Sequence, residues 1–241
     1  MGWPLVMDDE LMADAAAELV AAFTVTFFAA GSLLVQSLQT GSTQSPSLLT
    51  IAATTGAGYA LAIALAGPRS GGHANPVVSL AAWLSARLEA KRAGAYILAQ
   101  LVGGIGAALV LGALVPDTAL DQARYGATVG GNHTGALSAV TWELAATFFY
   151  TLAVLAAVFG DRSRATGIAT AGLGAFLAVL VAFPFTGASF NPARSLGPAL
   201  LSGTWTMQWV YVAGPVLGAA LAAGVHDGIL QPSQAQTGAD R

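Results

Sequence analysis

A short stretch that occurs twice decides the fold. It reads Ser70-Gly71-Gly72-His73-Ala74-Asn75-Pro76-Val77 in one half of the chain and Ser189-Phe190-Asn191-Pro192-Ala193-Arg194 in the other. Asparagine is a favoured N-cap, and proline is favoured in the first turn of a helix. Each copy therefore predicts a helix that starts at its proline, over about residues 76–86 and 192–201. At about 1.5 Å per residue, such helices cover only about half of a bilayer.

The composition around these stretches is typical of a membrane protein. Hydrophobic residues make up 55% of the 241 residues and charged residues only 9%, whereas a soluble domain carries about 25% charged residues. Because lipid offers the backbone no hydrogen-bond partner, we expect an all-α membrane protein. The uncharged runs predict six spanning helices, at about residues 14–36, 48–67, 93–115, 137–159, 165–184 and 207–230.

The membrane domain is expected over residues 14–230, in two halves at about 14–115 and 137–230. Residues 1–13 then form an N-terminal segment that carries acidic residues but no lysine or arginine, unlike a signal peptide. We expect this segment and Asp14 to be solvated, and residues 231–241 to form a polar tail. Seven basic residues fall on the side of the termini against two on the other side, which indicates cytoplasmic termini.

A weak internal repeat links the two halves. Residues 17–23 resemble residues 142–148, and each half holds three spans and one Asn-Pro stretch. The second half therefore enters the membrane from the opposite face, which makes the repeat inverted. The two short helices are then re-entrant half-helices whose N-termini meet at the midplane.

Such a meeting point has a chemical consequence. Non-helical backbone at membrane depth is tolerated only where it lines a water-filled cavity or is buried in protein. Each helix N-terminus brings about half a positive charge, and the asparagine amides can donate to a passing oxygen. These groups indicate a pore that passes neutral hydrogen-bonding molecules and rejects cations. A single Asn-Pro pair is often an ordinary turn, but two copies at matching places in a repeat argue against that interpretation.

These motifs resemble those of the aquaporin, or major intrinsic protein, family. Glu18, Glu143, Gln100 and Gly214-Pro215 also match the family pattern, over about residues 14–230. Val77 stands where alanine is commonest, a variation found in nodulin-like plant members and some bacterial members. The resemblance implies a right-handed bundle of six helices and two half-helices, assembled as a homotetramer with one pore per subunit.

The resemblance also implies roles for individual residues. Pore-lining carbonyls are expected from two loops, at Gly71, Gly72 and His73 and at Gly187, Ala188 and Ser189. Glu18 and Glu143 lie within spans, where a carboxylate is costly. They are either proton relays or braces that accept hydrogen bonds from the re-entrant loops, with Gln100 as a further brace; an ion-excluding pore favours braces. Arg194 is expected to face the pore, where its charge adds to cation exclusion, although a snorkelling surface arginine is the alternative. His133 and His226 are expected to be solvated.

The resemblance places a selectivity filter at Thr55, Val179, Ala188 and Arg194. Water-specific members resemble Phe, His, a small residue and Arg at these places, so the opening here is expected to be wider and half-apolar. Ser195 stands where glycerol facilitators typically carry aspartate. We therefore expect passage of glycerol, urea, ammonia or metalloid acids such as arsenous or boric acid, with some water. A water-selective channel and a coupled secondary transporter remain open alternatives.

Other functional classes find little support. The chain contains no cysteine, which excludes disulfides and thiolate metal sites. It shows no clustered histidines or paired-carboxylate motif, so we expect neither an enzyme nor a metal or cofactor. The expected partners are small neutral solutes, water and lipid, without nucleic acid. Alanine-rich composition and short loops favour the inner membrane of a bacterium.

Overall fold

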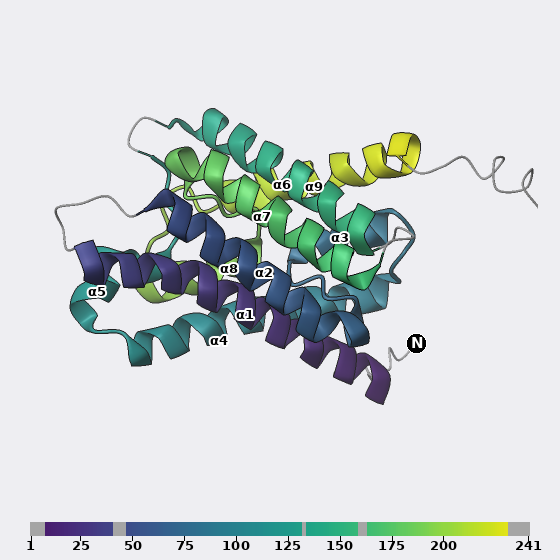
Figure 1. Ribbon diagram of the computed structural model, residues 1–241, viewed down its shortest axis with the longest axis horizontal. Helices are drawn as coiled ribbons and strands as arrows, with labels where there is room; N and C mark the ends of the chain where they lie inside the picture. The colour runs from purple at the N-terminus through teal and green to yellow at the C-terminus, as the bar shows by residue number, and fades with distance from the viewer. Residues whose placement is uncertain (1–7, 41–46, 132–133, 159–162, 231–241) are drawn as a thin grey trace, which may run out of the picture.

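The computed structural model describes residues 8–40, 47–131, 134–158 and 163–230 (Figure 1). All of the regular structure in this part of the chain is helical, which confirms the predicted fold class. The six long helices are α1 (Asp9–Thr40), α2 (Leu48–Ser70), α4 (Ala90–Leu114), α6 (Ala136–Val158), α7 (Arg164–Thr186) and α9 (Val210–Val225). The π-helical turn η2 (His226–Leu230) continues α9. Each of the six is long and apolar enough to cross a membrane.

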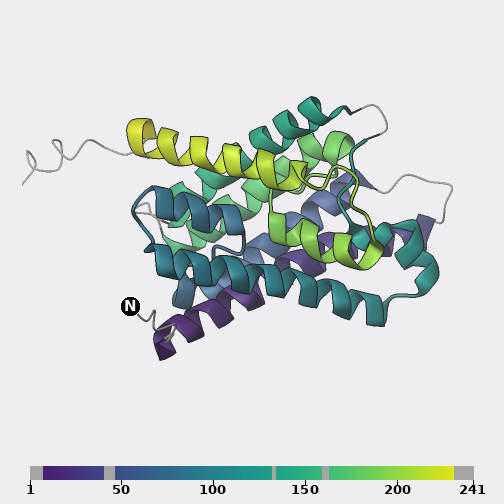
Figure 2. The same ribbon diagram turned by 180° about the vertical axis from the view of Figure 1, so that it is seen from behind.

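The two short helices begin where the Asn-Pro pairs predict. Helix α3 (Pro76–Leu84) follows the first pair and α8 (Pro192–Ser202) follows the second. Figure 2 shows both lying between α4 and α9, one toward each end of the bundle. The start of α1 and the end of η2 lie at the same end, which we call the terminal end, and α5 (Asp117–Gln122) lies at the far end (Figure 1).

Helix α1 begins at Asp9, so the acidic residues that follow belong to its first turns. The expectation that Asp14 is solvated is wrong, because its side chain is only 6% exposed. Its carboxylate lies 2.7 Å from Arg69 Nε at the end of α2 and also pairs with Arg92 on α4. This cluster joins three helices at the terminal end. Residues 1–7 and the tail 231–241 lie outside the described residues.

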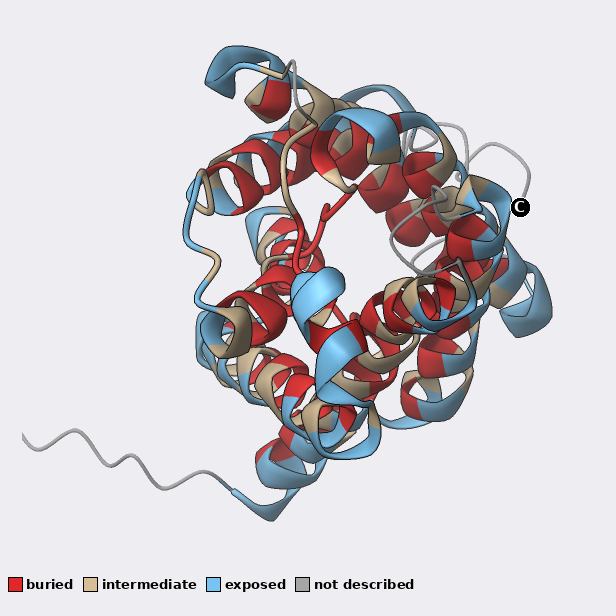
Figure 3. Ribbon diagram, turned by 90° about the vertical axis from the view of Figure 1, so that its left-hand side faces the viewer, coloured by how far each residue is buried: buried red, intermediate tan, exposed pale blue. Residues whose placement is uncertain are grey.

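Polar and apolar side chains are distributed as a membrane protein requires. Leucine side chains such as Leu98, Leu114 and Leu137 are 66%, 69% and 82% exposed on the outer surface. Glu18, Gln100 and Glu143, in contrast, are fully buried inside the bundle. Figure 3 shows buried residues facing the centre of the bundle and exposed ones on its outside. Lipid can solvate this surface, whereas the buried polar groups must find partners within the protein.

Glycines allow the helices to approach closely in both halves. A Cβ at Gly103 would lie 2.3 Å from the carbonyl oxygen of Leu19, and one at Gly218 would lie 2.3 Å from that of Leu144. The α1–α4 contact and the α6–α9 contact are therefore built alike. Small residues at such crossings let helix backbones meet in the absence of a hydrophobic driving force.

Each half-helix packs against the other half of the chain. Helix α8 rests on α4, and α3 rests on α9 as well as on α4. A Cβ at Gly104 of α4 would lie only 2.2 Å from the carbonyl oxygen of Ala193, so α8 seats directly on the α4 backbone. The two halves are thus interlocked at the midplane, where the candidate site lies.

Candidate functional site: a pore at the meeting point of two half-helices

The two asparagines cap their half-helices as the sequence predicts. Asn75 Oδ1 accepts from the backbone amide of Val77 at 3.1 Å, and Asn191 Oδ1 accepts from those of Ala193 at 3.0 Å and Arg194 at 3.3 Å. The side-chain amides cross between the halves. Asn75 Nδ2 donates to the Phe190 carbonyl at 2.8 Å, and Asn191 Nδ2 donates to the Ala74 carbonyl at 3.0 Å. These bonds fix the two helix N-termini against each other.

The loop before each asparagine follows an unusual backbone path. Gly71 and Gly187 end α2 and α7 with positive φ of 92° and 74°. Ala74, Ala188 and Phe190 also have positive φ, at 55°, 48° and 38°. A non-glycine residue in the left-handed region costs about 1–2 kcal/mol. Such a conformation persists only where surrounding contacts hold it.

In the first loop, Glu18 supplies those contacts. One carboxylate oxygen accepts from the His73 amide at 2.8 Å and from Ser70 Oγ at 2.6 Å. The other accepts from the Ala74 amide at 2.8 Å and from Gln100 Nε2 at 2.7 Å. The carboxylate therefore has four donors, one of them the amide of the left-handed residue Ala74.

Glu143 occupies the corresponding place in the second loop. Its two oxygens accept from the amides of Ser189 at 2.9 Å and Phe190 at 2.7 Å. Thr186, at the end of α7, also contacts the carboxylate. Phe190 stands directly before Asn191, as Ala74 stands directly before Asn75, and both have positive φ, so Glu143 acts on the same backbone position as Glu18. Both contacts have the geometry of a brace.

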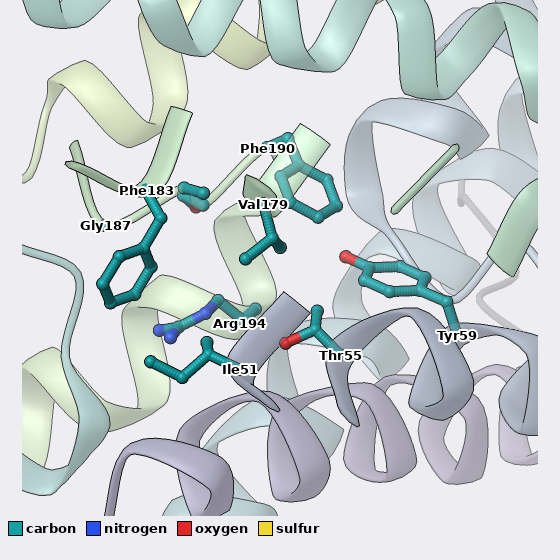
Figure 4. Close-up of a pocket in the computed structure, with 10 residues that line it drawn as sticks. Ile51, Thr55, Tyr59, Val179, Phe183, Gly187, Phe190 and Arg194 are labelled. Atoms are coloured by element: carbon teal, nitrogen blue, oxygen red, sulfur yellow. The ribbon is translucent and has the colours of Figure 1, made fainter. Parts of the chain in front are cut away.

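The four residues expected to form a filter lie around one small cavity. Thr55, Val179, Ala188 and Arg194 line it together with six other residues, which are Ile51, Tyr59, Phe183, Gly187, Ser189 and Phe190 (Figure 4). The space open to the centre of a water molecule is about 10 Å³, which is about what one water needs. Gly187, Ala188 and Ser189 border this cavity, whereas Gly71, Gly72 and His73 belong to the other loop and do not.

Arg194 is buried, with 4% of the residue exposed, and its side chain reaches the cavity (Figure 4). Its Nη1 donates to the carbonyl oxygen of Gly126 at 2.8 Å. Gly126 belongs to η1 (Arg124–Gly126) at the far end, and its φ is +73°. A Cβ there would lie 2.7 Å from Ala30, so glycine is needed for both the conformation and the close approach. The snorkelling alternative does not fit this buried position.

A model of the family described as "Major intrinsic protein" matches residues 7–226. The chain belongs to the major intrinsic protein family. It is 36% identical to mouse aquaporin-6 over 216 residues, covering 90% of this chain and 71% of the relative. It is also 41% identical to maize aquaporin TIP4-4 over 163 residues, covering 66% and 63%. The X-ray structure of the aquaglyceroporin from Plasmodium falciparum superimposes with a TM-score of 0.80 at 20% identity, covering 92% and 98% of the two chains.

This major intrinsic protein is therefore a multi-pass membrane channel and not an enzyme. Family membership sets aside the coupled transporter as an alternative. In the described part of the chain, no group of three or more metal-ligating side chains comes together.

Several residues around the pore of this major intrinsic protein were not found from the sequence. Tyr59 lines the cavity and accepts a hydrogen bond from Asn191 Nδ2 at 3.0 Å. Thr128 Oγ1 lies 2.7 Å from Ser195 Oγ, which in turn lies 2.5 Å from Ser189 Oγ. A tyrosine inside an apolar span gives no signal of its partner when that partner is over a hundred residues away.

One of the two histidines expected to be solvated is buried instead. His226 is buried, with 5% exposed, so its predicted solvation is wrong. The π-helical turn at the end of α9 brings its Nδ1 to 3.4 Å from Arg87 Nη2 and 3.1 Å from Asp227 Oδ1. His73 is also buried, and its Nδ1 lies 2.9 Å from Ser79 Oγ. His133 lies outside the described residues.

Proposed function

We propose that the chain forms a passive pore for small uncharged molecules larger than water, with water as a further permeant. The solutes in question are glycerol, urea, ammonia and the neutral acids of arsenic and boron. The observation that carries the proposal is that two small side chains, Thr55 and Val179, line the same cavity as Arg194. Small side chains leave room that aromatic and imidazole rings would fill.

Ion exclusion follows from the same region. The N-termini of α3 and α8 meet at the asparagines, and each contributes about half a positive charge. Arg194 adds a full charge, and in the described part of the chain its Nη1 donates to the Gly126 carbonyl. A cation entering here loses water and meets positive charge, whereas a neutral solute meets donors.

The lining of the cavity suits amphipathic solutes. Ile51, Val179 and Phe183 offer apolar surface, while Thr55 and Arg194 offer hydrogen-bonding groups (Figure 4). Ser195, in place of an acidic residue, is held by Thr128 and Ser189. A solute with both carbon and hydroxyl or amide surface can use both sides of such a lining.

A water-selective channel is the second candidate, and the volume of the cavity favours it. The space of about 10 Å³ accommodates one water molecule. The rings of Phe183, Tyr59 and Phe190 occupy part of the room that Thr55 and Val179 leave. In this case water is the only one of these molecules that crosses faster than it crosses a protein-free bilayer.

Stopped-flow light scattering on proteoliposomes distinguishes the two candidates. Vesicles containing the wild-type protein are challenged with gradients of water, urea and glycerol, and protein-free vesicles serve as the baseline. Urea or glycerol flux above baseline supports the wider pore; water flux alone contradicts it. The double variant Thr55→Phe with Val179→His should lose urea and glycerol flux while it keeps water flux.

We also propose that the channel assembles as a homotetramer with cytoplasmic termini, in a bacterial inner membrane. The orientation is supported by the basic residues Arg69, Arg87 and Arg92, which lie at or near the terminal end. Light scattering coupled to size exclusion in detergent tests the tetramer. Labelling of single cysteines introduced at either end of the bundle tests the orientation.

A further inference from the structure

We propose that Tyr59 forms a second constriction of the pore, at the midplane, and that it determines which molecules pass beyond Thr55. Its hydroxyl group occupies the position on Asn191 that a permeating oxygen would take, and its ring limits the size of that molecule. This inference rests on the proposed function, because it concerns the selectivity of the same pore.

The first observation concerns the hydrogens of the two asparagine amides. A side-chain amide has two N–H donors. In the described part of the chain, Asn75 Nδ2 has one protein acceptor, the Phe190 carbonyl at 2.8 Å, so its other hydrogen is open to a passing molecule. Asn191 Nδ2 has two acceptors, the Ala74 carbonyl and Tyr59 Oη, each at 3.0 Å. The second asparagine is therefore already saturated by protein.

The second observation is that this saturation breaks the symmetry of the repeat. Tyr59 stands twelve residues before Gly71, and Ala175 stands twelve residues before Gly187. Both positions are fully buried. The methyl group of Ala175 cannot accept a hydrogen bond, so α7 offers Asn75 nothing comparable. The hydroxyl group at Asn191 is thus a feature of one half and is not required by the shared backbone.

The third observation places Tyr59 along the pore. Ile51, Thr55 and Tyr59 follow one another at intervals of four residues on one face of α2, and all three line the cavity. Tyr59 therefore lies about 6 Å deeper than Thr55 along the helix axis. Figure 4 shows its hydroxyl pointing toward the region between Val179 and Phe190. A molecule that has passed Thr55 meets this hydroxyl next.

The fourth observation is the packing that holds the ring there. The Tyr59 ring lies 4.9 Å from that of Tyr150 and 5.5 Å from that of Phe190, measured between centroids. The Tyr150 hydroxyl is buried and has no hydrogen-bond partner in the described protein. Tyr150 does not line the cavity, so it supports the Tyr59 ring from outside the pore. The contacts with Tyr150 and Phe190 hold the Tyr59 ring in place.

Passage then requires exchange at Asn191. The entering molecule must displace Tyr59 Oη from the amide and offer its own oxygen or nitrogen as the acceptor. Molecules that hydrogen-bond well can do this at little net cost, because one hydrogen bond replaces another. Because the hydroxyl oxygen is fixed to the ring, this exchange requires a small shift of the ring or of the Asn191 amide, and the ring remains a steric limit. Thr55 and Val179 alone therefore do not set the width of the pore.

Two substitutions separate the hydroxyl from the ring. Tyr59→Phe keeps the ring and frees the Asn191 amide, so water permeability per channel should rise by about fivefold, the factor for one hydrogen bond. Urea and glycerol permeability should change less, because the ring still limits size. Tyr59→Val removes the ring as well, so urea and glycerol permeability should rise more than water permeability.

The measurements use stopped-flow light scattering on proteoliposomes with matched protein content. Tyr125→Phe is the matched control. It removes the same hydroxyl group from a tyrosine that lies beside Gly112, at the far end of the bundle. Size exclusion and circular dichroism in detergent confirm that each variant is folded before reconstitution. Tyr59→Phe changes no volume beyond one oxygen, so it provides a folded variant if Tyr59→Val does not.

The outcomes distinguish this inference from the proposed function. If wild-type channels conduct and the folded Tyr59 variants conduct all solutes at the wild-type rates, the inference is wrong and the proposed function stands. If wild-type channels pass only water and Tyr59→Val gains urea or glycerol flux, the inference stands and the solute range proposed above is wrong. If neither the wild-type channel nor any folded variant conducts above protein-free vesicles, both are wrong.

Discussion

The two re-entrant loops share a backbone path but differ in the side chains that hold it. In the first loop, Glu18 accepts from four donors, including Gln100 Nε2 and Ser70 Oγ. In the second loop, Glu143 accepts from the amides of Ser189 and Phe190 and contacts Thr186. Tyr96 and Tyr211 donate to the carbonyls of Ser70 and Thr186 in the same way. Four residues further on, α4 carries Gln100 where α9 carries Pro215.

The groups that face the pore come mainly from the second half, although the first half has more bracing contacts. Three residues after the asparagine, the first half carries Val78 and the second half carries Arg194. The cavity is bordered by the second loop, and Asn191 is the asparagine that Tyr59 saturates. The comparison teaches that the first half is the more strongly braced and the second half the more exposed to the solute. The two loops therefore share a backbone path but differ in function.

The largest expected effect is a loss of unfolding free energy when the same substitution, glutamate to glutamine, is made at Glu18 and at Glu143. In Glu18→Gln the new NH₂ group faces two donors in either orientation, whereas in Glu143→Gln, even with Thr186 beside the carboxylate, one orientation leaves it facing a single backbone amide. A hydrogen bond to a charged group contributes about 1.5–3 kcal/mol, so Glu18→Gln should lose about twice as much unfolding free energy. Thermal unfolding in detergent measures both. Equal losses would show that the two braces are equivalent.

Replacing Arg194 by valine makes the second half resemble the first. Removal of the buried charge should raise proton or cation leak by about tenfold or more, because a unit charge at close range contributes several kcal/mol. A pH-sensitive dye in proteoliposomes under an imposed potassium gradient measures the leak. Arg194→Lys keeps the charge, so its proton or cation leak should stay as low as that of the wild type. A leak as low as wild type in Arg194→Val would assign ion exclusion to the half-helices alone.

Replacing Gln100 by leucine makes the first brace resemble the second. The change removes the bonds from Nε2 to Glu18 at 2.7 Å and Ser79 at 3.0 Å. It also removes Oε1, which is buried without a partner in the described protein. Because these effects oppose each other, the loss of unfolding free energy should be only about 1 kcal/mol. A loss as large as that of Glu18→Gln would show that Gln100 carries most of the bracing.

The smallest effect is expected at Ser195. Its hydroxyl joins Thr128 on the far-end segment to Ser189 in the second loop. Ser195→Ala removes about 1 kcal/mol at most, since Ser189 Oγ still donates to the Asn191 carbonyl at 3.0 Å. Solute selectivity in stopped-flow assays should stay as in wild type. A change in the ratio of urea to water flux would show that Ser195 shapes the filter.

Much of the architecture could be predicted because the bilayer restricts the possible folds. Uncharged runs of sufficient length locate the spans, and an Asn-Pro pair specifies where a helix begins whatever surrounds it. The starts of α3 and α8 at Pro76 and Pro192 follow directly. Thr55 and Val179 line one cavity, while their assignment to a selectivity filter stays a prediction from the family resemblance.

Other features depend on contacts that spacing does not encode. The Gly126 carbonyl that holds Arg194 belongs to the short α5–η1 segment, which has neither the length nor the hydropathy of a span. Asp14 is buried because Arg69 and Arg92 converge on it from two other helices. Tyr59 looks like an ordinary core residue until α8 brings Asn191 to its hydroxyl. Each of these required the packed tertiary structure.

The interlocking of the halves has a consequence for how the chain is made. The acceptor for the Asn75 amide is the carbonyl of residue 190, and α4 is seated on α8 through Gly104. Synthesis proceeds from the N-terminus, so the first half enters the membrane long before either partner exists. The Asn75 amide in its loop therefore lacks this acceptor until α8 enters from the opposite side of the bilayer. The two loops therefore close together only after α8 has entered the membrane, and a chain that ends before α8 lacks the carbonyl that accepts from Asn75.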